Sequence, residues 1–125
     1  MNTDNTLNVL MQTEEKRHRF FAAWQRGVLL LGPEYFGPRS PAKARHAADL
    51  TPKPAMVEEV IPTLSGGEQQ LLAAMSSFYD PAWGEELATR IGDEKSVCGL
   101  TFNLDHEEMS ILCELLLNYC GWEED

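Results

Sequence analysis

The clearest structural signal in the sequence is Asp105-His106-Glu107-Glu108. The Asp105 side chain can accept from the backbone N–H of Glu108 while the Glu108 side chain reaches back, which is a capping box that starts a helix. The residues that then recur at helical spacing are Met109, Leu112, Cys113, Leu116, Tyr119 and Cys120. Gly121 is a typical terminator. The sequence therefore predicts a helix over 105–120, with Cys113 and Cys120 facing the core.

The segment before this helix carries the same kind of signal. Ser65-Gly66-Gly67-Glu68 is a second capping box. The apolar face that follows it consists of Leu71, Leu72, Met75, Phe78 and Tyr79. Asp80-Pro81 ends this helix and caps another, which carries Trp83, Leu87 and Ile91 and stops at Gly92. The weak alternation of 97–104 indicates one short extended segment.

The N-terminal part of the chain predicts a long helix over 4–31, capped by Asp4 or Asn5. Its apolar positions recur at steps of three and four residues. They are Leu7, Leu10, Met11, Phe21, Trp24, Val28 and Leu31. Gly27 is a point where this helix can bend or divide.

Six of the seven prolines fall within residues 32–64. Proline lacks a backbone N–H and fixes φ, so no long helix crosses this region. Ser40-Pro41 favours a short helix over 42–50, because a capping serine precedes proline at the first helical position. Residues 55–61 have room for another turn or two. The sequence does not decide whether this connector is ordered or flexible.

These segments together predict an all-α fold, a compact bundle of about four to six helices with a Pro-rich irregular connection in the middle. We expect residues 1–125 to form one helical domain, because a chain of 125 residues has the commonest length of a single domain. Its three parts are the N-terminal helix (1–31), the connector (32–64) and an acidic helical half (65–125).

Charge is divided unevenly along the chain, whose formal net charge is −10. Residues 1–60 hold eight Lys and Arg against seven Asp and Glu, whereas residues 61–125 hold two against thirteen. The second part should repel nucleic-acid phosphates and attract basic surfaces. The alternative is that its acidity serves only to keep the protein soluble. We therefore expect no direct nucleic-acid binding through the C-terminal half.

The cellular setting is indicated by what the sequence lacks. No apolar run is long enough for a transmembrane helix, and the first residues do not resemble a signal peptide. Cys98, Cys113 and Cys120 are an odd number without CxxC spacing, which favours reduced thiols. These features predict a cytoplasmic protein without a membrane partner.

Several motifs suggest chemistry that their context does not support. Leu64–Glu68 matches the signature loop of ABC-type ATPases, but the phosphate-cradling GxxxxGK[ST] is absent. His106, Cys113 and Cys120 are seven residues apart, about 10 Å along a helix, which is too far to share one zinc ion. Glu15 and His18 form a lone ExxH pair without the second ExxH of di-iron bundles. We assign no catalytic, cofactor-binding or metal-binding residues.

One basic, aromatic-rich segment stands out at Lys16-Arg17-His18-Arg19-Phe20-Phe21, with Trp24 and Arg26 beyond it. Such a segment can contact phosphates, an acidic lipid surface or an acidic partner. It can equally be an amphipathic helix, or pair with the acidic half of the same chain, which is the use we expect.

The function predicted from these features is a small acidic, non-enzymatic binding or regulatory protein that contacts a basic protein partner. The candidate contact residues are Tyr79, Trp83, Glu85, Glu86, Trp122, Glu123 and Glu124. The alternatives are a nucleic-acid mimic that inhibits a DNA-binding or defence protein, a small enzyme with an unrecognised site, and a structural subunit of a larger assembly. A homodimer is also compatible with the sequence.

Overall fold

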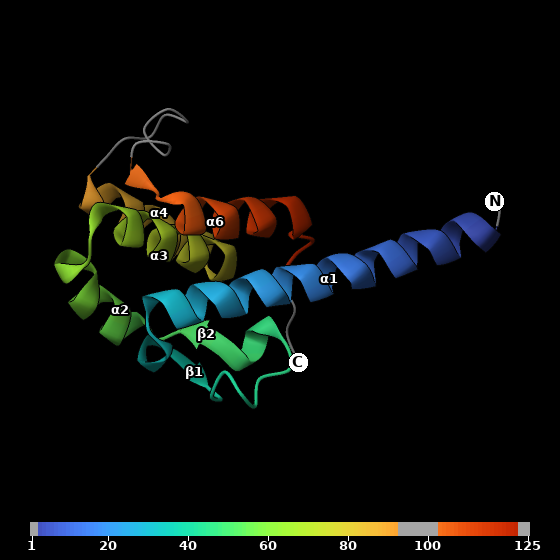
Figure 1. The fold of residues 1–125 in the computed structure, drawn as a ribbon, viewed down its shortest axis with the longest axis horizontal. Coiled ribbons are helices and arrows are strands. Elements are labelled where there is room, and N and C mark those ends of the chain that lie inside the picture. The colour runs from blue at the N-terminus through green and yellow to red at the C-terminus, as the bar shows by residue number, and fades with distance from the viewer. Residues whose placement is uncertain (1–2, 93–102, 123–125) are drawn as a thin grey trace.

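The computed structural model describes residues 3–92 and 103–122, and these form a mostly helical domain, as predicted. The four longest helices are α1 (Thr3–Leu31), α3 (Gly66–Tyr79), α4 (Pro81–Ile91) and α6 (His106–Asn118). In Figure 1, α4 and α6 lie on one side of α1 and a small β-hairpin lies on the other. The N-terminal half of α1 projects well beyond the rest of the domain (Figure 1).

The helix boundaries follow the local capping signals. At the start of α3 the Ser65 hydroxyl accepts from the Glu68 N–H at 3.3 Å, and Glu68 accepts from the Ser65 N–H at 3.1 Å. Asp105 and Glu108 make the same reciprocal pair at the start of α6. The Asp80 side chain caps α4, and Gly92 ends it in the left-handed conformation at φ 87°. Both capping boxes and the end of α4 are therefore confirmed.

The core lies where one face of α1 packs against α6 and α3. Trp24 and Val28 are fully buried on this face, together with Leu71 and Met75 of α3 and Ile111 of α6. Gly27 neither bends nor divides α1, because the helix is continuous. The glycine instead makes room for α3, since a Cβ there would lie 2.5 Å from the Met75 sulfur. Because α1 already begins at Thr3, the predicted caps Asp4 and Asn5 lie inside the helix.

The connector is ordered and contributes to the core. Its strands β1 (Phe36–Pro38) and β2 (Leu50–Pro52) pair antiparallel, with Phe36 opposite Pro52. Short 3-10 turns occupy Pro33–Tyr35, Ala47–Asp49 and Ile61–Thr63. The helix expected over 55–61 is present as α2 (Pro54–Val60).

The helix predicted over 42–50 is wrong. After Ser40 the chain makes a single turn over 41–43, in which the Lys43 and Ala44 N–H groups donate to the Ser40 carbonyl. A 3-10 turn follows at Ala47–Asp49, and Leu50 enters β2. Asp49 explains the difference, because its backbone carbonyl accepts from the Arg39 N–H at 3.1 Å and its side chain accepts from the Arg45 N–H at 2.9 Å. These bonds close a loop and satisfy groups that a helix would have bonded internally.

The rotation of α6 also differs from the prediction. Its buried residues are Glu108, Ile111, Leu112, Leu115 and Asn118, whereas Cys113 and Cys120 are exposed. The expectation that both cysteines face the core is therefore wrong. The helix ends at Asn118, whose side-chain amide donates to the Glu114 carbonyl at 2.8 Å. Most of the segment predicted to be extended, 97–104, lies outside the described residues, although Leu104 is described and buried.

Candidate functional site

The predicted aromatic contact residues Tyr79 and Trp122 lie together, 5.3 Å apart between ring centroids. Trp122 also packs edge-on against Trp24 at 5.0 Å and is partly buried against the hydrophobic core. Phe20 stands at the centre of the same group, in contact with Trp24, Phe78, Tyr119 and Trp122. Tyr79 keeps 37% of its surface exposed. Trp122 thus stabilises the domain, and Tyr79 presents one edge to solvent.

Trp83 has different neighbours. It is half-buried on α4, and its indole Nε1 donates to a carboxylate oxygen of Glu58 at 3.3 Å. The same Glu58 carboxylate pairs with Arg90 of α4 at 3.0 Å. This small network links α2 to α4, and the main packing partner of α4 is α3.

Glu85 and Glu86 lie on that outward face, and both are exposed. With Ala82, Thr89 and Arg90 they line a shallow hollow of about 450 Å³. Within residues 10–92 and 103–122, neither carboxylate has an ion-pair partner. The other two predicted acidic contacts, Glu123 and Glu124, lie outside the described residues.

Two carboxylates are buried among the residues that the structure describes, Glu108 and Asp49; the sequence indicated a capping role for Glu108 but not its burial, and gave no sign of Asp49. Glu108 is 4% exposed, and it packs so closely over Gly67 that a Cβ there would overlap it. Burial raises the pKa of Glu108, and the nearby charges of Asp105 and Glu68 add to this, while a hydrogen bond from the Asp105 backbone opposes it. The carboxyl thus links the starts of α3 and α6.

Asp49 is the second buried carboxylate. Besides the two loop bonds described above, it accepts from the Arg39 Nε at 3.2 Å and lies 3.2 Å from the His46 Nε2. The hydrogen bond from the Arg45 backbone is the main cause that lowers the pKa of Asp49. Burial opposes this, and the charges of His46 and Arg39 assist it. Asp49 therefore anchors a loop rich in cationic side chains.

The other motifs singled out in the sequence have structural roles. Glu15 pairs with Arg19 at 2.7 Å on the exposed side of α1, and Arg26 pairs with Glu107 of the acidic half at 2.9 Å. The expectation that the basic segment pairs with the acidic half thus holds for Arg26. Ser65–Glu68 serves as a cap. Within the described residues, no group of three His, Cys, Asp or Glu side chains is arranged to hold a metal ion. No helix among those residues has the length and apolar character that crossing a bilayer requires.

No family model, curated protein or solved structure matches this chain, so its function has to be inferred from the surfaces of the molecule itself.

Proposed function

We propose that this chain is a non-enzymatic binding or regulatory protein that docks a basic surface of another protein through the outward face of α4. The observation that carries the proposal is the pair Glu85 and Glu86, exposed and without an ion-pair partner in the described part of the chain. Exposed carboxylates at an interface raise the association rate with basic partners and help to fix their orientation.

The surroundings of these carboxylates support a docking role. Ala82 and Thr89 line the shallow hollow beside them, so a partner could bury apolar atoms there as well as pair charges. α4 packs closely against α3, and the bonds from Trp83 and Arg90 to Glu58 link it to α2 as well. A surface that is already ordered loses less conformational entropy when it binds. Three cysteines without CxxC spacing favour a reducing compartment, so the proposal sets this interaction in the cytoplasm.

The test is affinity capture from extracts of the native cell at low and moderate salt, with wild-type protein and two charge-matched variants. Glu85→Lys/Glu86→Lys reverses the α4 surface, and Glu34→Lys/Glu59→Lys makes the same charge change on exposed residues that also lack an ion-pair partner in the described part of the chain. We expect the wild type and the Lys variant outside α4 to retain a basic protein, and the α4 variant to lose it. The rate at which that partner associates with the wild type should fall as salt rises. Equal retention by both variants would overturn the proposal. Reversal at Glu123 and Glu124 is a further arm and should also weaken binding.

A second candidate function, a subunit that assembles with further copies of this chain, is favoured by exposed apolar side chains. Leu10 and Met11 are each 61% exposed on the projecting half of α1, and Leu116 and Leu117 are similarly exposed on α6. An isolated helical arm gains stability when a partner covers it. Light scattering should then show an oligomer that Leu10→Gln/Met11→Gln dissociates and the equally exposed Leu29→Gln does not. A monomer at high concentration would exclude this candidate.

A further inference from the structure

A cationic surface lies between α1 and the connector, away from the α4 face. We call it the cationic track and define it by Arg17, His18, Arg39, Lys43, Arg45 and His46. It joins residues from two segments that are far apart in the sequence. The sequence alone therefore could not predict that these cations lie side by side.

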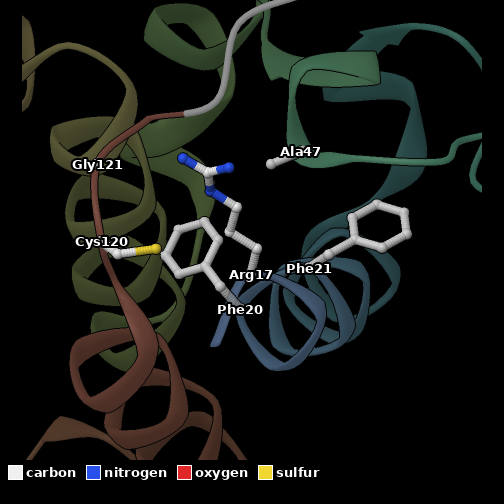
Figure 2. Close-up of a pocket in the computed structure, with 6 residues that line it drawn as sticks. All are labelled: Arg17, Phe20, Phe21, Ala47, Cys120 and Gly121. Atoms are coloured by element: carbon white, nitrogen blue, oxygen red, sulfur yellow. The ribbon is translucent and has the colours of Figure 1, made fainter. Parts of the chain in front are cut away.

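Three neighbouring hollows follow the track because they share lining residues. The first is narrow, with about 10 Å³ of room, enough for roughly one water molecule. Figure 2 shows Arg17 extending between Gly121 and Ala47 there, with the rings of Phe20 and Phe21 on either side. Arg17 and Phe21 also line the second hollow, of about 270 Å³. Arg45 and His46 connect that one to a third of about 680 Å³.

The connector side of the track is held in place by Asp49. This buried carboxylate binds the Arg45 backbone and the Nε of Arg39, while the Arg39 side chain stays 61% exposed. Asp49 is bonded to Nε, and the end of the Arg39 guanidinium formed by its two terminal nitrogens can still donate to another oxyanion. The loop is thus already organised before any ligand arrives.

The charge balance of the track favours an anion. Arg17, Lys43 and Arg45 have no ion-pair partner within the described residues. With Arg39 they make four permanent cations. In the described part of the chain two carboxylates line these hollows, the exposed Glu14 and the buried Asp49 that pairs with Arg39, so the cations remain in excess. Arginine pairs with phosphate in two-point geometry, which suits a phosphate ligand.

The length of the track and the aromatic ring beside it indicate which kind of phosphate ligand fits. Hollows joined by shared cations suit a chain of regularly spaced phosphates better than a single one. Phe21 is half-buried and lines the same hollow as Arg17 and Arg45, where it offers a ring on which a base can stack. We propose that the cationic track binds a short segment of single-stranded nucleic acid, with phosphates along the arginines and a base against Phe21.

The net charge of −10 does not prevent this binding. The connector lies on one side of α1, and α4 and α6 lie on the other (Figure 1). A helix with its side chains is about 10–12 Å across, whereas the Debye length is about 8 Å at physiological salt. The carboxylates on α4 and α6 are therefore largely screened from a ligand on the track. This site is independent of the α4 surface, so each proposal can fail without the other.

The test measures fluorescence anisotropy of labelled 12-nucleotide single-stranded DNA and RNA over a range of salt concentrations. Arg17→Gln/Arg45→Gln should weaken binding about tenfold or more, and should lower the slope of log affinity against log salt by about 1.4, or about 0.7 per phosphate contact. Arg26→Gln/Arg90→Gln removes the same charge from residues that pair with Glu107 and Glu58, and it should bind like the wild type.

The stacking contact needs a variant that keeps the packing, because Phe21 also touches the core. Phe21→Leu retains an apolar side chain without a ring, so it should weaken binding several-fold and leave the salt slope unchanged. Failure of both probes to bind at about 50 mM salt would overturn the proposal, as would equal losses in the two arginine variants. Equal competition by an oligoglutamate peptide would also overturn it and would indicate an acidic protein as the ligand.

Discussion

The indole Nε1 of Trp24 donates a hydrogen bond to the backbone carbonyl oxygen of Leu50 over 2.8 Å, and both residues are fully buried. This bond ties the long helix α1 to strand β2 of the connector. It also explains why a segment with six prolines is ordered, since the hairpin supplies a buried acceptor and α1 supplies the donor. Unpaired polar groups in such a position are costly, so the two partners require each other.

Trp24→Phe should therefore destabilise the protein by about 2–4 kcal/mol, because the Leu50 carbonyl loses its partner and the smaller ring leaves a cavity. Urea denaturation measures the change. Trp83→Phe is the matched control, since Trp83 is only half-buried and its acceptor Glu58 also pairs with Arg90. The control should cost less than about 1 kcal/mol. Similar losses in both variants would mean that the buried bond contributes nothing specific.

Gly84→Ala should destabilise the protein although it lies inside α4, where alanine usually gains about 1 kcal/mol over glycine. A Cβ on Gly84 would overlap the backbone of Ser77, because α3 and α4 pack closely there. We expect a loss of about 1–3 kcal/mol from overpacking, measured by thermal or urea unfolding. At Gly66, in the first turn of α3, a Cβ would lie 3.7 Å from its nearest neighbour, so Gly66→Ala should be neutral or stabilising. A stable Gly84→Ala protein would show that the two helices are further apart.

Asp49→Asn should destabilise the protein by about 1–3 kcal/mol at neutral pH, because a neutral amide replaces the charged carboxylate that accepts two hydrogen bonds and lies 3.2 Å from the His46 Nε2. The pKa of Asp49 in the folded protein lies below the ordinary aspartate value of 3.8. Its contribution is therefore present above that value and is lost as pH falls through the folded-state pKa. The difference between wild type and variant should shrink in urea titrations below about pH 4. Glu59→Gln, an exposed control on α2, should show neither effect.

Local signals in the sequence predicted the parts of the fold that depend on neighbouring residues. The Ser65 and Asp105 capping boxes and the Asp80 cap each involve residues three positions apart, so their partners stand in the sequence itself. The same is true of Gly92, whose left-handed conformation ends α4. Helix starts and stops could therefore be predicted closely.

Features that depend on distant residues could not be predicted in this way. Residues 111–117 of α6 are apolar on almost every side, so periodicity alone did not determine which side is buried. Two polar residues, Glu108 and Asn118, lie inward because each has a hydrogen-bonding partner close by. The hairpin, the Trp24 bond and the cationic track each join segments more than ten residues apart. Their partners become visible only in the folded chain.

Cys113 and Cys120 should react with a thiol reagent in the native protein at rates close to those of the denatured protein. Both are exposed, in contrast to the expectation from their helical spacing. Accessible thiols react in proportion to their thiolate fraction, and burial is what normally slows them. Mass spectrometry of the labelled peptides measures each site, with Cys113→Ser and Cys120→Ser as controls. Labelling that is slow until denaturant is added would show that α6 is rotated as the sequence suggested.

The buried carboxyl of Glu108 should make the protein less stable as pH rises above about 4.5, the ordinary pKa of a glutamate. Burial raises the pKa in the folded state, so between the two values the folded protein holds a proton that the unfolded chain has released. Stability then falls with rising pH until the folded-state pKa is passed, and it stays lower above it. Glu108→Gln keeps an oxygen that can accept from the Asp105 N–H and removes the titration.

We expect this variant to be at least as stable as the wild type at neutral pH and to lose the downward slope in urea titrations above pH 4.5. Glu107→Gln changes the neighbouring exposed carboxylate, which pairs with Arg26 at the surface, and should leave the slope intact. If Glu108→Gln is instead less stable at neutral pH, the ionised carboxylate is stabilised by the first turn of α3, where it lies over Gly67. The charge at this helix start would then outweigh the cost of burial.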